Sequence, residues 1–146
     1  MKEQLGPDYY ISDDRKKIDL KKVAGLLTNA YWSKGIKYKE VAKGANNSAL
    51  IVAAFTGKGQ LVAYSRVISD KTRFAYLLDV FVDEAHRRKG IGQGMVRFIL
   101  NHPSLKKVYQ WVLITTDAHG VYQKVGFKPL ANPEKWMEIR HPRPEI

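Results

Sequence analysis

The chain has 146 residues, no cysteine and a formal net charge of +11 at pH 7. This length suits one domain with a sizeable core and is short for two, so we expect a single domain over residues 1–146. The absence of cysteine excludes disulfides, cysteine nucleophiles and thiolate metal sites. Residues 1–7 lack the apolar core of a signal peptide, and no apolar stretch approaches the roughly 20 residues of a membrane span. We therefore expect a cytoplasmic protein with no membrane segment.

Hydrophobic periodicity and turn residues predict alternating strands and helices. In chain order we expect a strand at 9–11, helices at 19–30 and 38–43, strands at 49–55, 61–68 and 73–82, a helix at 91–100, a strand at 108–115, a short helix at 118–124, and final strands at 127–130 and 136–139. Asp19 and Asp117 each stand where a helix N-cap is expected.

The connections between these elements predict the topology of the sheet. Short turns join the strands at 49–55, 61–68 and 73–82, so these strands should be antiparallel. The helix at 91–100 is a crossover, so the strands on either side of it should be parallel. The expected fold class is α/β, with a mixed, mostly antiparallel sheet of six to seven strands and helices on both faces.

The segment Arg87-Arg88-Lys89-Gly90-Ile91-Gly92-Gln93-Gly94 separates the long strand from the helix that follows it. Each of its glycines weakens a helix by about 1 kcal/mol relative to alanine, which a sequence tolerates where bare backbone must approach another group. A helix N-terminus offers unpaired N–H groups and a partial positive charge, and the basic side chains add to that charge. The segment is therefore predicted to bind a pyrophosphate, although its spacing fits neither a P-loop nor the dinucleotide fingerprint.

The same segment resembles a signature of the GNAT acetyltransferase superfamily. Residues 87–92 read R-R-K-G-I-G and match the pattern Gln/Arg-x-x-Gly-x-Gly/Ala. A second family pattern, A-x-x-x-Y-x-K-x-G-F, is matched by Ala118, Tyr122, Lys124, Gly126 and Phe127. The two motifs occur in the family's order, and the resemblance extends over residues 8 to 130.

This resemblance implies acetyl-CoA as the acetyl donor and no metal. It also implies that the two parallel strands splay apart, so that backbone groups of Val80, Phe81 and Val82 can pair with the pantetheine arm. The pyrophosphate is expected on Arg87, Arg88, Lys89, Gly90, Ile91, Gly92, Gln93 and Gly94.

The implied activity is that of an N-acetyltransferase, which moves the acetyl group of acetyl-CoA directly to an amine in a ternary complex. Tyr122 is expected to donate a hydrogen bond or a proton to the leaving thiolate. Some family members have a glutamate base where Tyr76 stands here. Asp79, the only charged residue inside this apolar strand, is the candidate for orienting the amine or relaying its proton, with a structural ion pair as the alternative. His119, one turn before Tyr122, is a less favoured candidate for proton transfer.

Acceptor contacts are expected from Trp32, Arg66 and Asp79. Trp32 lies between the first two strands, a region that usually sets specificity in the resembling family, and its ring suits an apolar or cationic substrate. Arg66 interrupts an apolar strand, where it can bind a carboxylate of the substrate or pair with Asp79 or Asp70. The expected acceptor is a small amine or a protein amino group, and related domains often form homodimers.

Two other functions stay open at this point. A GNAT-like module that binds acetyl-CoA without catalysis would explain the glycine segment and would need no base. The charge of +11 fits a solvated basic surface or a contribution to coenzyme binding. Nucleic acid is the least favoured ligand, because the basic residues are scattered and no aromatic-basic recognition motif is visible.

Overall fold

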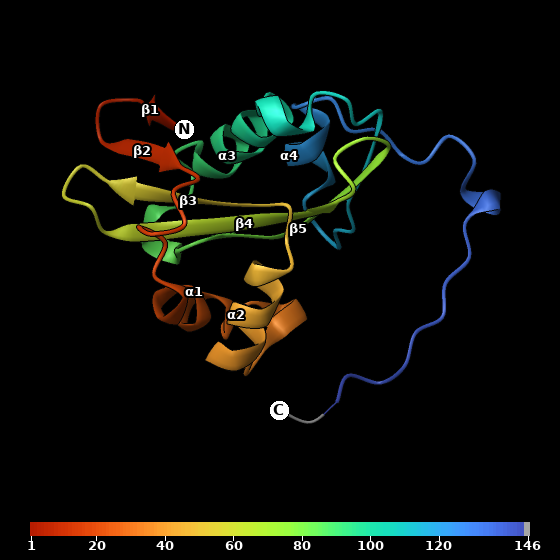
Figure 1. The fold of residues 1–146 in the computed structure, drawn as a ribbon, viewed down its shortest axis with the longest axis horizontal. Helices are drawn as coiled ribbons and strands as arrows, with labels where there is room; N and C mark the ends of the chain where they lie inside the picture. Colours follow the sequence, from red (N-terminus) through yellow and green to blue (C-terminus); the bar gives the residue numbers. More distant parts are fainter. Residues whose placement is uncertain (145–146) are drawn as a thin grey trace.

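The computed structural model describes residues 1–144 and contains one six-stranded sheet with the order β1-β2-β3-β4-β5-β6 (Figure 1). The strands span Lys2–Leu5 (β1), Tyr9–Ser12 (β2), Leu50–Thr56 (β3), Leu61–Ser69 (β4), Phe74–Val82 (β5) and Gln110–Val112 (β6). The α-helices span Leu20–Leu27 (α1), Tyr38–Asn46 (α2), Ile91–Leu100 (α3) and His119–Gln123 (α4). No helix in this described part is long and apolar enough to cross a membrane.

The sheet is antiparallel from β1 to β5 and parallel between β5 and β6. The parallel pairing joins residues 74–76 to residues 110–112 and then stops, whereas β5 continues to Val82. The second half of β5 therefore has no strand partner on its β6 side. This arrangement confirms the predicted mixed sheet with a parallel pair whose strands separate.

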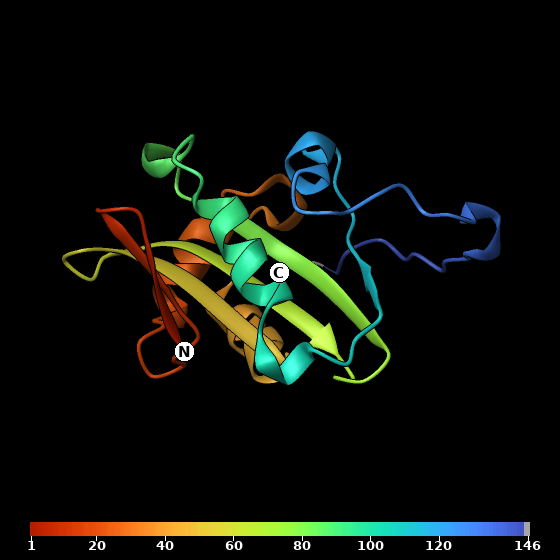
Figure 2. The same cartoon turned by 90° about the horizontal axis from the view of Figure 1, so that it is seen from above.

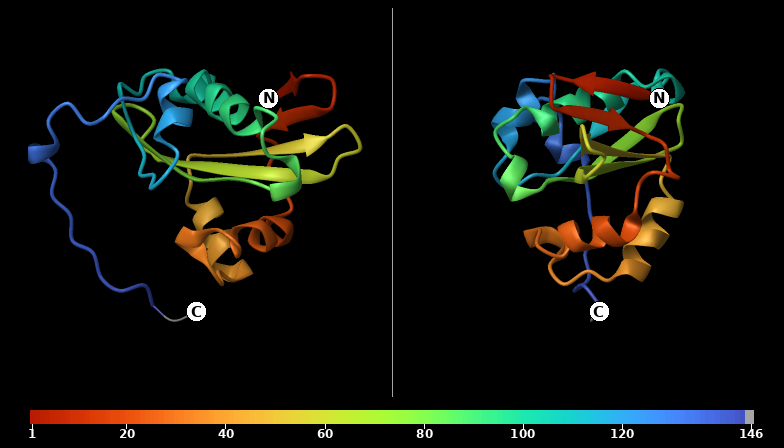
Figure 3. Two further views of the ribbon diagram at one scale, coloured as in Figure 1. Left: turned by 180° about the vertical axis from the view of Figure 1, so that it is seen from behind. Right: turned by 90° about the vertical axis from the view of Figure 1, so that its left-hand side faces the viewer.

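Helices cover both faces of the sheet (Figures 2 and 3). On one face, α1 and α2 pack through Val23, Leu27 and Val41 onto buried residues of β3 and β4. On the other face, Met95 and Ile99 of α3 enter a second apolar cluster. Because β3 and β4 are covered on both sides, they are apolar almost throughout instead of alternating with polar residues.

The ends of the chain differ from the prediction. Strand β1 was not expected, because its sequence KEQL has no alternating pattern; it forms by pairing with β2 across a turn at Gly6, whose φ is 59°. Strand β6 has three residues rather than the eight expected. Asp117 does not cap α4, since the N-cap residue is Ala118 and no side chain bonds there.

The final strands predicted at 127–130 and 136–139 are wrong. Residues 128–144, here called the C-terminal arm, are irregular apart from a short helical turn at Pro133–Lys135. The arm leads away from the sheet and returns toward the layer of α1 and α2 (Figures 1 and 3). Apolar residues occur in it at strand-like spacing, but no neighbouring strand pairs with them.

Candidate active site

A β-bulge in β5 places Asp79 where the two parallel strands have separated. Tyr64 of β4 pairs with Phe81 and Arg66 pairs with Leu78, so β5 carries one extra residue between these points. Asp79 has a φ of 55°, a left-handed conformation that is uncommon for residues other than glycine but is tolerated by Asp and Asn. Bulges redirect side chains, and here the carboxylate lies among residues of the α1–α2 face.

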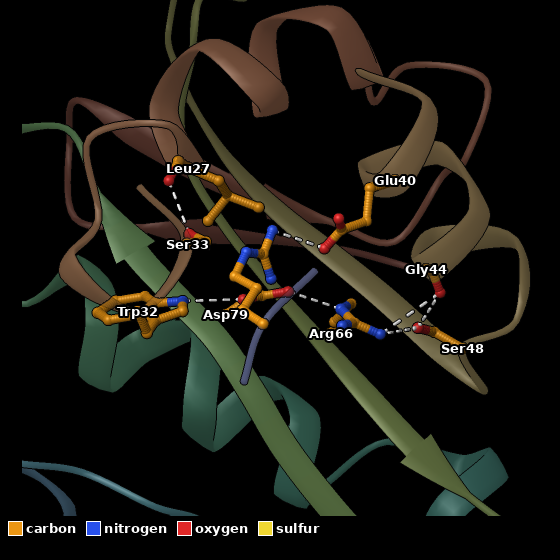
Figure 4. Close-up of polar contacts among 9 residues, drawn as sticks. Leu27, Trp32, Ser33, Glu40, Gly44, Ser48, Arg66 and Asp79 are labelled. Atoms are coloured by element: carbon orange, nitrogen blue, oxygen red, sulfur yellow. Dashed lines mark hydrogen bonds and ion pairs between the residues drawn. The ribbon is translucent and has the colours of Figure 1, made fainter. Parts of the chain in front are cut away.

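The structure brings the three predicted acceptor residues together. The carboxylate of Asp79 accepts a hydrogen bond from Nε of Arg66 at 2.7 Å and another from Nε1 of Trp32 at 2.9 Å (Figure 4). The Asp79 and Arg66 side chains are 11% and 19% exposed. The ion pair considered as the alternative for both residues is therefore present.

The guanidinium of Arg66 is fixed by α2 as well as by Asp79. Its Nη1 donates to the hydroxyl of Ser48 at 3.3 Å and lies 3.5 Å from the carbonyl of Gly44. A Cβ at Gly44 would stand 3.3 Å from Cζ of Arg66, so glycine here lets the guanidinium lie against the helix. The orientation of Arg66 is thus set from two sides.

Arg66 and Asp79 line a pocket of about 380 Å³ between the sheet and helices α1 and α2. Leu27, Ile36 and Val41 contribute apolar walls. Tyr64 lies at the floor; it is fully buried, and its hydroxyl has no hydrogen-bond partner among residues 1–144. Sequence reasoning did not identify Tyr64, because a tyrosine in an apolar strand is indistinguishable from a core residue.

The segment Tyr31–Ser33 links the two sides of the opening between β5 and β6. Trp32 bonds to Asp79, and its ring packs edge-on against Phe81 with centroids 6.1 Å apart. The adjacent Tyr31 accepts a hydrogen bond from the backbone N–H of Thr116, in the loop after β6, at 3.3 Å. Trp32 is 40% exposed, so part of the ring remains available to a ligand.

Tyr122 lies half-buried on α4, with its ring edge-on to Phe127 at 6.0 Å. Burial raises the pKa of Tyr122 above its ordinary value, and Tyr31 and Asp117 add to this effect. The side chain is therefore a protonated phenol at neutral pH. No described residue is hydrogen-bonded to its hydroxyl, and His119 of the same helix is exposed.

The N-terminus of α3 presents backbone amides next to β5. Gly90 is the N-cap with a φ of 77°, and its carbonyl accepts the amide of Gly94 at 2.9 Å. Helix geometry leaves the amides of residues 91–93 without an intrahelical partner. A Cβ at Gly92 would meet only Val82, at 3.8 Å, so the fold itself does not require glycine there.

The eight residues of the predicted pyrophosphate segment, 87–94, differ in what they contact. Gly94 faces the core, where a Cβ would stand 2.8 Å from Cδ1 of Leu5, so it serves the packing of α3 on β1. Arg87 donates to the carbonyl of Val82 at 3.0 Å. Arg88 and Lys89 are exposed and form no ion pair with any of residues 1–144. At the start of α3, Gly92 lies beside Val82, the last residue of β5.

Within the described residues, no group of three His, Cys, Asp or Glu side chains is placed to hold a metal ion. The candidate groups described above are backbone amides, one ion pair, two tyrosines and a tryptophan. They come from β4, β5, α3, α4 and the segment after α1.

Comparison with known proteins identifies related folds. A protein from Xanthomonas campestris pv. campestris, assigned to the GNAT family of acetyltransferases, is 35% identical, with a TM-score of 0.86 over 93% of this chain and 95% of that one. A protein of Clostridium acetobutylicum, solved with acetyl-CoA, is 19% identical, with a TM-score of 0.66 over 96% of both chains.

One sequence relative is the glucosamine 6-phosphate N-acetyltransferase 1 of Oryza sativa subsp. japonica, 28% identical over 98 residues. The match spans 62% of this chain and 59% of that enzyme's length. The family model for the acetyltransferase (GNAT) domain matches residues 46–129, which is more than half of the chain. The protein therefore belongs to the GNAT acetyltransferase family.

Proposed function

We propose that this protein transfers the acetyl group of acetyl-CoA directly to an amine acceptor within a ternary complex. The observation that carries the proposal is the unpaired amide cluster at residues 91–93, with open space over Gly92, beside the half of β5 that has no strand partner on its β6 side. An anionic diphosphate fits the first feature, and an amide-rich chain fits the second.

The donor would lie along β5 and end at α3. Apart from the Val82 carbonyl, which accepts a hydrogen bond from Arg87, the outer backbone groups of residues 80–82 would pair with the pantetheine arm. The amides of residues 91–93 would receive the pyrophosphate. Arg88 and Lys89 supply unpaired positive charge for the phosphates, while Arg87 holds the loop to Val82. The Clostridium acetobutylicum relative was solved with acetyl-CoA, which supports the same donor for this chain.

Tyr122 is the proposed donor to the departing thiolate. A phenol whose pKa is raised by burial keeps its proton and can stabilise the developing charge on sulfur. The chain has no cysteine to form a thioester intermediate, which favours direct attack by the amine. Most of the rate acceleration would then come from holding the amine beside the thioester.

Asp79 is the proposed contact for the amine. The hydrogen bonds from Trp32 and Arg66 occupy two of about four lone-pair positions on the carboxylate, so it can also accept a hydrogen bond from an ammonium group. Trp32 and Arg66 hold the carboxylate in place beside the opening of the sheet. We propose a small amine as the acceptor, in keeping with the size of the pocket and with the amino sugar named for the Oryza relative.

The proposal is tested by measuring coenzyme A release from acetyl-CoA across a panel of small amines, amino sugars and peptides. We expect turnover with a subset of small amines. The variant Tyr122→Phe should lower kcat tenfold or more and leave the Kd of acetyl-CoA unchanged. Tight binding of acetyl-CoA with no turnover on any amine would instead favour a non-catalytic acetyl-CoA-binding module.

We further propose that two copies of the chain pair through the C-terminal arm. Met137 and Ile139 of the arm are 97% and 88% exposed, and β6 stands at the edge of the sheet. A second copy can cover both features by strand pairing. Sedimentation of the intact protein should give a dimer, and the double variant Met137→Glu, Ile139→Glu should give a monomer. A monomeric wild-type protein at tens of micromolar would contradict this pairing.

A further inference from the structure

The hydroxyl of Tyr64 has an unusual environment. The side chain is fully buried at the floor of the pocket under α1 and α2, and its hydroxyl has no partner among the described residues. Buried polar groups are almost always hydrogen-bonded, so an unpaired hydroxyl on a residue that lines a pocket indicates a missing partner. Burial raises the pKa of Tyr64, which keeps the group a neutral hydrogen-bond donor.

The charges around the pocket favour a partner that accepts hydrogen bonds. Asp79 is paired with Arg66, and Glu40 at the rim is paired with Arg143 of the C-terminal arm at 2.9 Å. Lys43, which also lines the pocket, has no ion pair within residues 1–144. The four charged residues of the lining sum to zero, but within residues 1–144 both acidic side chains are paired with arginines whereas Lys43 is not, which leaves N–H and O–H donors without partners.

The guanidinium of Arg66 adds two further donors. Its Nε is engaged by Asp79 and its Nη1 by Ser48 and Gly44, while no hydrogen bond joins Nη2 to another described residue. Because Arg66 is held on two sides, Nη2 is presented in a fixed position. A charged N–H donor held in one orientation suits an oxygen of a carboxylate or a phosphate.

We propose that this pocket binds the anionic group, a carboxylate or a phosphate, of the acetyl acceptor, with the hydroxyl of Tyr64 and Nη2 of Arg66 as donors. This inference rests on the proposed function and names its substrate class: small amines that also carry an acidic group. The ammonium end lies toward Asp79 at the opening of the sheet, and the acidic end lies in the pocket.

The variant Tyr64→Phe tests the proposal, and Ser65→Ala is its matched control. Ser65 is the neighbouring residue of β4, is equally buried and also has an unpaired hydroxyl, but it does not line the pocket. Both variants remove a buried, unsatisfied hydroxyl, so neither should lower Tm.

Three amines of similar length differ in the group at the end away from nitrogen: 4-aminobutanoate carries a carboxylate, phosphoethanolamine a phosphate and 4-aminobutanol a neutral hydroxyl. Of the two anionic amines, the one with the lower KM for the wild-type protein is the test substrate. For Tyr64→Phe we expect its KM to rise about tenfold or more, while the KM of the amino alcohol stays unchanged. Ser65→Ala should behave as wild type with all three. Equal changes for anionic and neutral amines, or no change for either, would overturn the proposal.

A binding measurement separates this inference from the proposed activity. The anionic amine should raise the Tm of the wild-type protein and of Ser65→Ala, with a much smaller rise for Tyr64→Phe, whether or not turnover occurs. Binding of this kind without turnover would refute the catalytic function and keep the anion pocket. Turnover of amines with no such binding difference would keep the function and refute the pocket.

Discussion

The indole N–H of Trp32 donates a 2.9 Å hydrogen bond to the carboxylate of Asp79, a residue 47 positions further along the chain. The bond joins the segment after α1 to the bulge in β5 (Figure 4). On its other oxygen, Asp79 accepts from Nε of Arg66, so one carboxylate holds both side chains of the proposed acceptor site. We therefore expect the position of Asp79 to matter for the stability of the fold as well as for the proposed contact with the amine.

Replacing Asp79 by Asn should destabilise the fold through Arg66. Asn keeps an oxygen for Trp32 and tolerates the left-handed backbone at this position, so the change isolates the loss of charge. Leaving the largely buried guanidinium without its counter-ion should lower the free energy of unfolding by about 3 kcal/mol. Urea denaturation measures the change.

The variant Arg143→Gln provides the control for this ion pair. Its pair with Glu40 is exposed, with side chains 42% and 51% accessible, and exposed pairs contribute about 0.5 kcal/mol or less. If Asp79→Asn were no more destabilising than Arg143→Gln, the pair with Arg66 would not be a structural element of the site.

Replacement by leucine should weaken coenzyme binding at Gly92 and should instead lower stability at Gly94. A Cβ at Gly92 meets only Val82, at an ordinary contact distance of 3.8 Å, so Gly92→Leu should fold with an unchanged Tm. Its side chain would occupy the space over the amides of residues 91–93, and the Kd of acetyl-CoA should rise at least a hundredfold. Isothermal titration calorimetry measures this loss.

A leucine at Gly94 enters the core beside Leu5 and Ile11, where even a Cβ is too close. Overpacking of this kind costs about 1–3 kcal/mol, so the protein should lose stability while the folded fraction still binds acetyl-CoA.

Normal coenzyme binding by Gly92→Leu would show that the pyrophosphate lies elsewhere.

Local sequence patterns predicted the elements that depend on short-range interactions. The helix start at Asp19, the strands around the turn at residues 57–60 and the glycine-bearing helix all occur near their expected positions. The GNAT motifs lie within single loops and helices, which explains why the resemblance could identify the family from the sequence.

Features that depend on pairing between distant segments could not be predicted in the same way. The bulge at Asp79 follows from the register of β4 against β5, which an unbroken apolar run does not reveal. The unpaired state of the Tyr64 hydroxyl depends on what α1 and α2 place above it. The arm residues at 136–139 have strand-forming side chains, but a strand needs a partner, and no described strand pairs with them.

The two aspartates predicted as helix caps should differ in their effect on stability. The side chain of Asp19 accepts a hydrogen bond from the amide of Lys21 at 3.0 Å at the start of α1, so Asp19→Ala should lower the free energy of unfolding by about 1 kcal/mol. Asp117 makes no cap bond to α4, and Asp117→Ala should be neutral within about 0.5 kcal/mol. Chemical denaturation of both variants side by side checks the assignment, and equal losses would contradict it.

The raised pKa of Tyr122 predicts how activity depends on alkaline pH. Burial disfavours the charged phenolate and raises the pKa of Tyr122 above the ordinary tyrosine pKa of 10.0. At pH 10, where an ordinary tyrosine is half ionised, most Tyr122 side chains therefore keep their proton. If Tyr122 supplies a proton or a hydrogen bond to the leaving thiolate, kcat should stay near its maximum up to pH 10 and decline above it. The amine acceptor loses its own proton over this range, which removes the requirement for a base and leaves the state of Tyr122 as the limiting factor. The measurement is kcat between pH 8 and 11 at saturating substrates, with circular dichroism at each pH to establish that the protein is folded. Tyr122→Phe should show a low kcat without this decline, whereas a wild-type decline centred below pH 10 would assign the alkaline limb to another group.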